Sequence, residues 1–94
     1  MTVFTPTTRL GPHPDVVATS LAGGDVVLLQ LATKQYYSLN QTGARIWKWV
    51  EERKDIAGIC GCLEAEFDIA PPGAQEHVVG LLENLAAEQL VILG

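Results

Sequence analysis

The chain has 94 residues, a mass of 10.1 kDa and a formal net charge of −5, a length that suits a single domain. Hydrophobic residues make up 48% of it and the mean hydropathy is +0.21, which excludes a disordered tail. The acidic balance is unsuited to non-specific nucleic-acid binding, because that binding depends on neutralising phosphates.

The charge is distributed unevenly along the chain. Residues 1–50 contain four basic and two acidic residues, whereas residues 51–94 contain two basic and nine acidic ones. This asymmetry favours a ligand of basic character near the C-terminal half. An ordinary solubilising helix surface explains it equally well.

The sequence also indicates a compartment. The first 14 residues lack a basic cluster followed by an apolar core, so we expect no secretory signal. No apolar run approaches the roughly 20 residues that cross a bilayer. Cys60 and Cys62 fall two positions apart in a helical pattern, so they point in different directions and neither pair nor chelate a metal together. We expect a cytoplasmic protein with no membrane span, no metal and no cofactor.

Taken in chain order, residues 1–15 contain three prolines and are predicted to be an extended lead-in to one domain over residues 16–94. Residues 16–21 form the first expected strand, closed by the turn residues Gly23 and Gly24. Within residues 25–31 both alternating sets contain apolar residues, Val27, Leu29 and Leu31 in one and Val26 and Leu28 in the other, which predicts a central strand covered on both faces.

A third strand is expected over residues 35–39, and the pattern then becomes helical. Asn40 is a candidate N-cap for a helix that ends near Glu52. Asp55 is a candidate N-cap for a second helix that extends to Phe67. Pro71-Pro72 opens a third helix over residues 71–90, and the apolar residues 91–94 are expected to dock on the core. The predicted fold class is α+β: a three-stranded antiparallel meander followed by three helices, similar to a winged helix-turn-helix.

Catalytic patterns are missing from the sequence. His13 and His77 have no ligand spacing with each other or with the cysteines, and no glycine-rich phosphate loop follows a strand. We therefore predict that the chain is not an enzyme. A DNA-recognition role for the third helix is disfavoured, because residues 71–90 contain three glutamates and no Lys or Arg.

The third strand is the more informative element. It is an inferred edge strand that carries Tyr36 and Tyr37 and has no proline or inward charge to protect it. An incoming peptide strand uses such free backbone groups beside aromatic side chains. Two other interpretations stay open: a tyrosine that simply caps the core, and an edge that pairs in a homodimer.

The same region resembles a known family. The run Tyr36-Tyr37-Ser38-Leu39-Asn40-Gln41-Thr42-Gly43-Ala44-Arg45-Ile46-Trp47, with residues 27–31 before it and residues 59–67 and 77–85 after it, resembles the PqqD-like family over roughly residues 16–92. The namesake of this family is the small peptide chaperone of pyrroloquinoline quinone biosynthesis.

The resemblance implies a RiPP recognition element, a domain that captures the leader of a ribosomally made precursor peptide. In such domains the leader adds as a strand to the third strand and lies against the third helix. Carried onto this chain, the implied peptide-binding residues are Lys34, Gln35, Tyr36, Tyr37 and Ser38 from the strand and His77, Val78, Leu81, Leu82 and Leu85 from the helix. Strand alternation separates the two tyrosines without showing which one meets the leader.

Among such domains, this chain looks most like the leader-binding half of a split lasso-peptide B protein. The implied partners are the precursor leader peptide and a separate cysteine protease of the same pathway. Many relatives carry Asp where this chain has His77, so an acidic contact at that position is in doubt. Pyrroloquinoline quinone maturation or another radical-enzyme pathway is the alternative.

Overall fold

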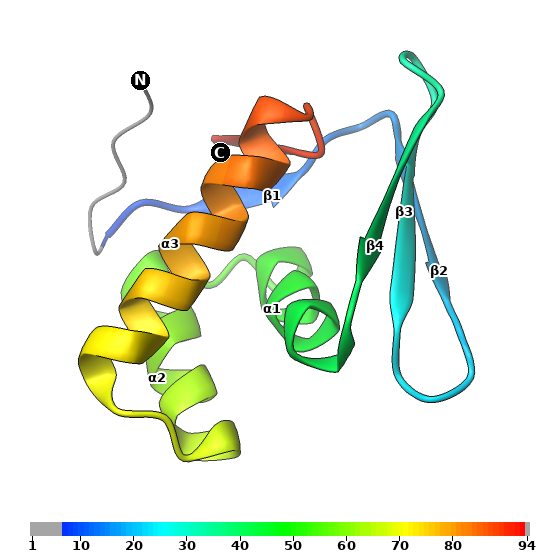
Figure 1. Cartoon of the computed structure of the whole chain (residues 1–94). Coiled ribbons are helices and arrows are strands. Elements are labelled where there is room, and N and C mark those ends of the chain that lie inside the picture. The colour runs from blue at the N-terminus through cyan, green and yellow to red at the C-terminus, as the bar shows by residue number, and fades with distance from the viewer. Residues whose placement is uncertain (1–6, 94) are drawn as a thin grey trace.

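The computed structural model describes residues 7–93 and has the predicted α+β architecture (Figure 1). A three-stranded antiparallel sheet is followed by three helices, and a two-stranded pair stands beside them. In chain order the elements are β1 (Leu10–Pro12), β2 (Val16–Ser20), β3 (Val26–Gln30), β4 (Gln35–Leu39), α1 (Gln41–Glu51), α2 (Ile56–Phe67), α3 (Pro71–Ala87) and β5 (Val91–Leu93).

The main sheet is the predicted meander, with β3 between β2 and β4. Its register aligns Gln30 of β3 with Val16 of β2 and with Gln35 of β4. The β2–β3 turn contains Gly23 and Gly24 at φ values of 90° and 94°, which glycine adopts without the steric cost of a side chain. The turn predicted from these two residues is therefore confirmed.

The sheet is covered on one face only, and the expectation that both faces of the central strand are covered is wrong. All three helices lie on the same side of the sheet (Figure 1). Leu28 and Gln30 point to that side and are fully buried, whereas Leu31 is 51% exposed. Val27 and Leu29 face the other side and are half-buried, because cross-strand neighbours shield them where no second layer does.

The second sheet contains a strand from the expected lead-in. β1 pairs with β5 in antiparallel register, from Leu10 opposite Leu93 to Pro12 opposite Val91. Leu10 and Val91 are 2% and 3% exposed and belong to the hydrophobic core. Residues 10–12 are thus extended in β1, and they hold the C-terminal strand against the helices.

Side-chain caps start the first two helices where they were predicted. The Asn40 side chain accepts a hydrogen bond of 2.9 Å from the Gly43 N–H, and the Asp55 side chain accepts one of 2.8 Å from the Gly58 N–H. Such caps satisfy backbone donors that the first helical turn leaves unpaired. The third helix ends at Ala87, three residues before the predicted end.

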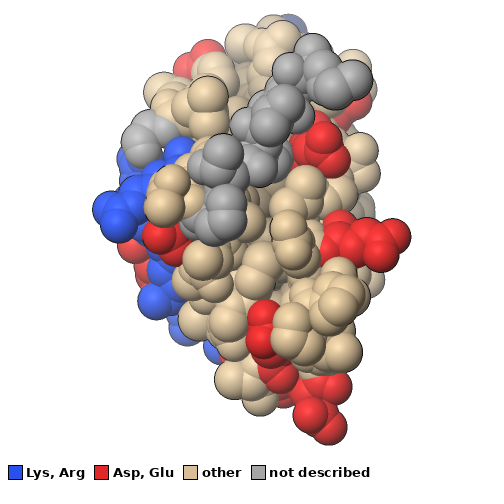
Figure 2. Space-filling model, turned by 90° about the vertical axis from the view of Figure 1, so that its left-hand side faces the viewer, with Lys and Arg blue, Asp and Glu red and all other residues tan. Residues whose placement is uncertain are grey.

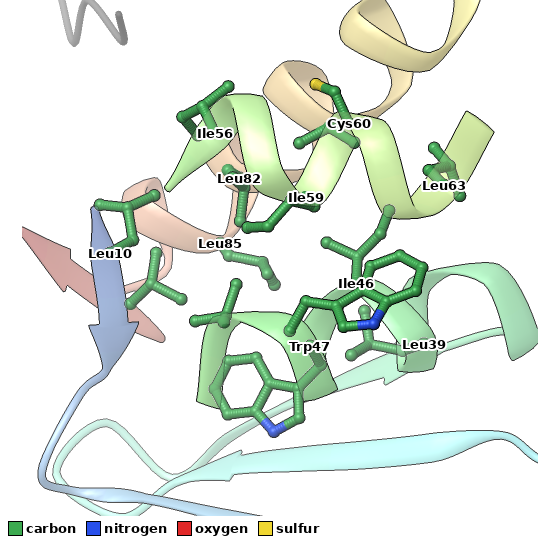
Figure 3. Close-up of a cluster of buried hydrophobic side chains, with 14 of the residues drawn as sticks. Leu10, Leu39, Ile46, Trp47, Ile56, Ile59, Cys60, Leu63, Leu82 and Leu85 are labelled. Atoms are coloured by element: carbon green, nitrogen blue, oxygen red, sulfur yellow. The ribbon is translucent and has the colours of Figure 1, made fainter. Parts of the chain in front are cut away.

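One hydrophobic core joins the helices to the inner face of the sheet (Figure 3). Ile46 and Val50 of α1, Leu63 of α2 and Leu82 of α3 have no exposed surface. Within residues 7–93, no helix is long and apolar enough to span a membrane.

Candidate functional site

The candidate site begins with the free edge of β4. In the part of the chain that the structure describes, β4 pairs with β3 and with no other strand. Its sequence, Gln-Tyr-Tyr-Ser-Leu, contains no proline or charged residue, so this edge lacks the usual protection against pairing with another chain. The predicted edge strand is confirmed.

The hydrogen-bond register shows which backbone groups this edge offers. The Leu31 N–H donates to the Asp15 carbonyl and the Leu21 N–H donates to the Asp25 carbonyl, so the odd-numbered residues of β3 face β2. Backbone groups alternate in direction along an antiparallel strand. The even-numbered residues of β3 therefore face β4, and within β4 the N–H and C=O groups of Tyr36 and Ser38 point to the free edge.

The two tyrosines of β4 have different environments. Tyr36 lies opposite Leu29 on the outer face and is 71% exposed. Tyr37 lies opposite Leu28, is half-buried and packs against the hydrophobic core. Tyr37 is thus the tyrosine on the helix side of the sheet, a point that alternation alone leaves open.

The turn before β4 places Lys34 and Gln35 at the start of the edge. Lys34 has a φ of 60°, in the left-handed region, and its N–H donates to the Gln30 carbonyl at 2.7 Å. Both side chains are exposed. The Lys34 N–H is thus already bonded within the turn, so the free backbone N–H groups of the edge begin at Tyr36.

The predicted residues of α3 fall into two groups. Val78, Leu82 and Leu85 are 0% exposed and form part of the core. Their side chains pack α3 against the rest of the domain and are not accessible to a ligand. Leu81 is half-buried and His77 is exposed. These two are therefore the α3 residues of the predicted set that are accessible to a ligand.

The surface of α3 is acidic. Its sequence contains Glu76 and Glu83, Glu88 follows at the C-cap, and all three are exposed. Figure 2 shows Asp and Glu gathered mainly along one side of the face it presents and Lys and Arg along the other. A shallow hollow of about 440 Å³ lies along the same helix, between Pro72 and Glu83, with Val79 in its lining.

Residues 7–93 give little support for a metal site or a reactive thiol. No group of three or more His, Cys, Asp or Glu side chains there is arranged to hold a metal ion. Cys60 and Cys62 are free thiols; Cys60 is buried and Cys62 half-buried. Burial raises the pKa of the Cys60 thiol, with a smaller contribution from Glu64, which makes this thiol a poor nucleophile.

One further residue of the site region is not revealed by the sequence pattern. Gln30 ends the buried face of β3 and has no exposed surface. Its side-chain amide donates to the Gln89 carbonyl just beyond α3 at 2.7 Å. A run of apolar residues with one glutamine at its end gives no signal of a contact 59 positions away.

Comparison with known structures finds close similarity to leader-binding proteins. The structure "TbiB1 in Complex with the TbiA(beta) Leader Peptide" has a TM-score of 0.81 and 31% sequence identity, and the match covers 86% of this chain and 93% of that one. The structure "Lasso peptide synthetase B1 complexed with the leader peptide" has a TM-score of 0.80, with coverage of 88% and 96%. Its identity of 20% limits that likeness to the fold.

Sequence comparison gives the same family. No curated protein matches the chain at a significant level. The family described as "Coenzyme PQQ synthesis protein D (PqqD)" matches residues 25–91, which include the main part of the sheet and all three helices. With this match over most of its length, the chain belongs to the PqqD family.

Proposed function

We propose that this protein binds the leader of a ribosomally made precursor peptide by strand addition to β4, without catalysing a reaction. The observation that carries the proposal is the free edge of β4, where Tyr36 and Ser38 direct unpaired backbone groups away from β3. The 31% identical relative that was solved in complex with a leader peptide supports the same role.

The proposed binding mode has two sources of affinity. A strand added to β4 gains hydrogen bonds with Tyr36 and Ser38, and such ladder bonds hold the peptide in register. The half-buried side chains of Tyr37 and Leu81 offer apolar contacts on the helix side. Because a leader is disordered before it binds, these contacts have to offset the cost of ordering it.

An NMR titration tests this proposal. The probe is a synthetic peptide with the sequence of the leader encoded beside this protein, and a scrambled peptide is the control. Backbone amides of residues 34–38 and 77–85 should shift on addition of the leader and stay unchanged with the scrambled peptide. Shifts confined to other residues would contradict the proposal.

We further propose that the pathway is lasso-peptide biosynthesis in the cytoplasm, with a separate cysteine protease as partner. The relative at 31% identity, solved with a leader peptide, supports the leader-binding part of this assignment, and the fold is shared with a lasso peptide synthetase B1 protein. Exposed apolar side chains, Val17 and Tyr36 on the outer sheet face and Leu31 in the turn after β3, are typical of a macromolecular contact surface. Co-purification of the tagged protein with the protease encoded beside it, with and without leader, tests this partner.

The family match favours a second pathway, pyrroloquinoline quinone biosynthesis. Titration with the precursor peptide of that cofactor distinguishes the two pathways, since the chain should prefer the peptide of its own pathway. A homodimer paired through β4 is the outcome to exclude in parallel. Light scattering over a dilution series would detect a dimer that persists at low concentration and ignores added leader.

A further inference from the structure

The feature that carries a further inference is the buried amide of Gln30. Among residues 7–93, Gln30 is the one polar residue that is buried, and it is 0% exposed. Burial of an amide is costly unless its hydrogen bonds are satisfied. The partners of this amide therefore matter more than those of a polar group at the surface.

The side chain of Gln30 bonds in two directions. Its Oε1 accepts from the Ala32 N–H at 2.8 Å, inside the turn that leads to β4. Its Nε2 donates to the Gln89 carbonyl at 2.7 Å, at the C-terminal end of α3. The Gln30 backbone carbonyl also accepts from the Lys34 N–H at 2.7 Å. One residue thus orders the turn and ties it to the helix.

The backbone around Gln89 is held in the position that this hydrogen bond requires. Gln89 has a φ of 59°, which turns the chain away from the helix axis, and the Leu90 N–H bonds back to the Leu85 carbonyl at 2.8 Å. Leu90 itself is 1% exposed. The carbonyl that Gln30 meets is therefore held in a fixed place relative to α3.

The register places this contact at one end of the proposed peptide site. Gln30 is the β3 partner of Gln35, the first residue of β4. The hydrogen bond to Gln89 thus links the β3 residue beside the start of β4 to the end of α3, the helix proposed as the other wall of the site. Within residues 7–93, this is the side-chain hydrogen bond that links β3 or β4 to α3 or the turn after it.

We propose that Gln30 is a positioning residue for leader binding: its amide fixes the separation of β4 and α3, so that both walls meet the peptide at once. This inference rests on the proposed function. If the contact is lost, α3 and β4 vary in separation, and only a fraction of molecules has the binding-competent spacing. The apparent affinity falls in proportion to that fraction.

The test compares Gln30→Met, which keeps the length of the side chain and loses both side-chain hydrogen bonds, with Gln30→Glu, whose ionised carboxylate keeps the acceptor for Ala32 and has no donor for Gln89. Ile59→Val is the matched control, because Ile59 is 1% exposed in α2 and its truncation lowers stability away from β4. Leader affinity is measured by calorimetry at a temperature where thermal unfolding shows each variant folded. Gln30→Asn replaces any Gln30 variant that does not fold, since it is one methylene too short to bridge both partners.

We expect Gln30→Met and Gln30→Glu to bind the leader at least tenfold more weakly than the wild type, and Ile59→Val to bind within twofold of it. Amides of residues 34–38 and 85–90 should shift in the peptide-free Gln30→Met protein, while those of α2 stay in place. Folded Gln30 variants that bind like the wild type would overturn the inference and leave the proposed function standing. A wild type that does not bind the leader would overturn both.

Discussion

Tyr36 and Tyr37 are neighbours in β4, yet they lie on opposite faces of the sheet: the Tyr36 side chain is 71% exposed, and the Tyr37 side chain packs against the hydrophobic core. The register places them opposite Leu29 and Leu28 of β3. Because the helices cover only the face of Leu28, the two side chains have different consequences for stability and for binding.

The first prediction concerns this pair. Tyr37→Ala should lower the free energy of unfolding by about 1–3 kcal/mol, since it removes a half-buried aromatic ring, and should weaken leader binding on the helix side. Tyr36→Ala should change the free energy of unfolding by less than about 0.5 kcal/mol. Chemical denaturation and calorimetry measure both effects. Equal losses of stability in the two variants would contradict the assigned faces.

The second prediction concerns the backbone of the free edge. Ser38→Pro removes an N–H that points away from β3, and proline is tolerated at such positions of edge strands. The variant should therefore remain folded and lose most of its affinity for the leader. Ser38→Ala keeps the N–H and serves as the control, with wild-type affinity expected. A folded Ser38→Pro protein with unchanged affinity would exclude strand addition at β4.

The third prediction concerns the turn that begins β4. Lys34 has a φ of 60°, a conformation that costs a residue with a side chain about 1–2 kcal/mol and that glycine adopts freely. Lys34→Gly should raise the free energy of unfolding by about 1 kcal/mol, and Lys34→Val should lower it because Val is β-branched. Urea titrations of the three proteins measure the order, and a more stable Val variant would be incompatible with the turn.

The fourth prediction concerns the two thiols. Burial raises the pKa of Cys60, so iodoacetamide at mildly alkaline pH should modify the half-buried Cys62 first and Cys60 only after unfolding. Since the unfolded Cys60 thiol ionises at a lower pH than the folded one, stability should decrease as the pH rises past the ordinary pKa of a thiol. Cys60→Ala should reduce that dependence. Mass spectrometry of the modified protein identifies the order of reaction.

The elements of the fold could be predicted because each has a local signal. Asn40 and Asp55 directly precede the two segments with helical hydrophobic spacing, and both accept the expected capping bonds. Gly23 and Gly24 mark the only tight turn that requires positive φ at glycine in residues 7–93. In each case the determining interaction spans a few residues, so the sequence contains all of it.

The long-range features had no such signal. β1 is three residues long and pairs with a strand about 80 positions later, and the amide of Gln30 meets a carbonyl 59 positions away. The sequence also did not predict that the outer face of the sheet is uncovered. Val27 and Leu29 on that face are as apolar as residues that a second layer covers. What covers a strand depends on elements elsewhere in the chain.

Because the helices lie on one side of the sheet, only some positions of a bound leader peptide would contact the protein. A strand joined to β4 would turn its odd residues toward the protein and its even residues toward water, or the reverse, because side chains alternate along a strand. Sequence preference should accordingly recur at every second position of the leader. The intervening positions would be free to vary, or to serve whichever protein acts on the precursor next.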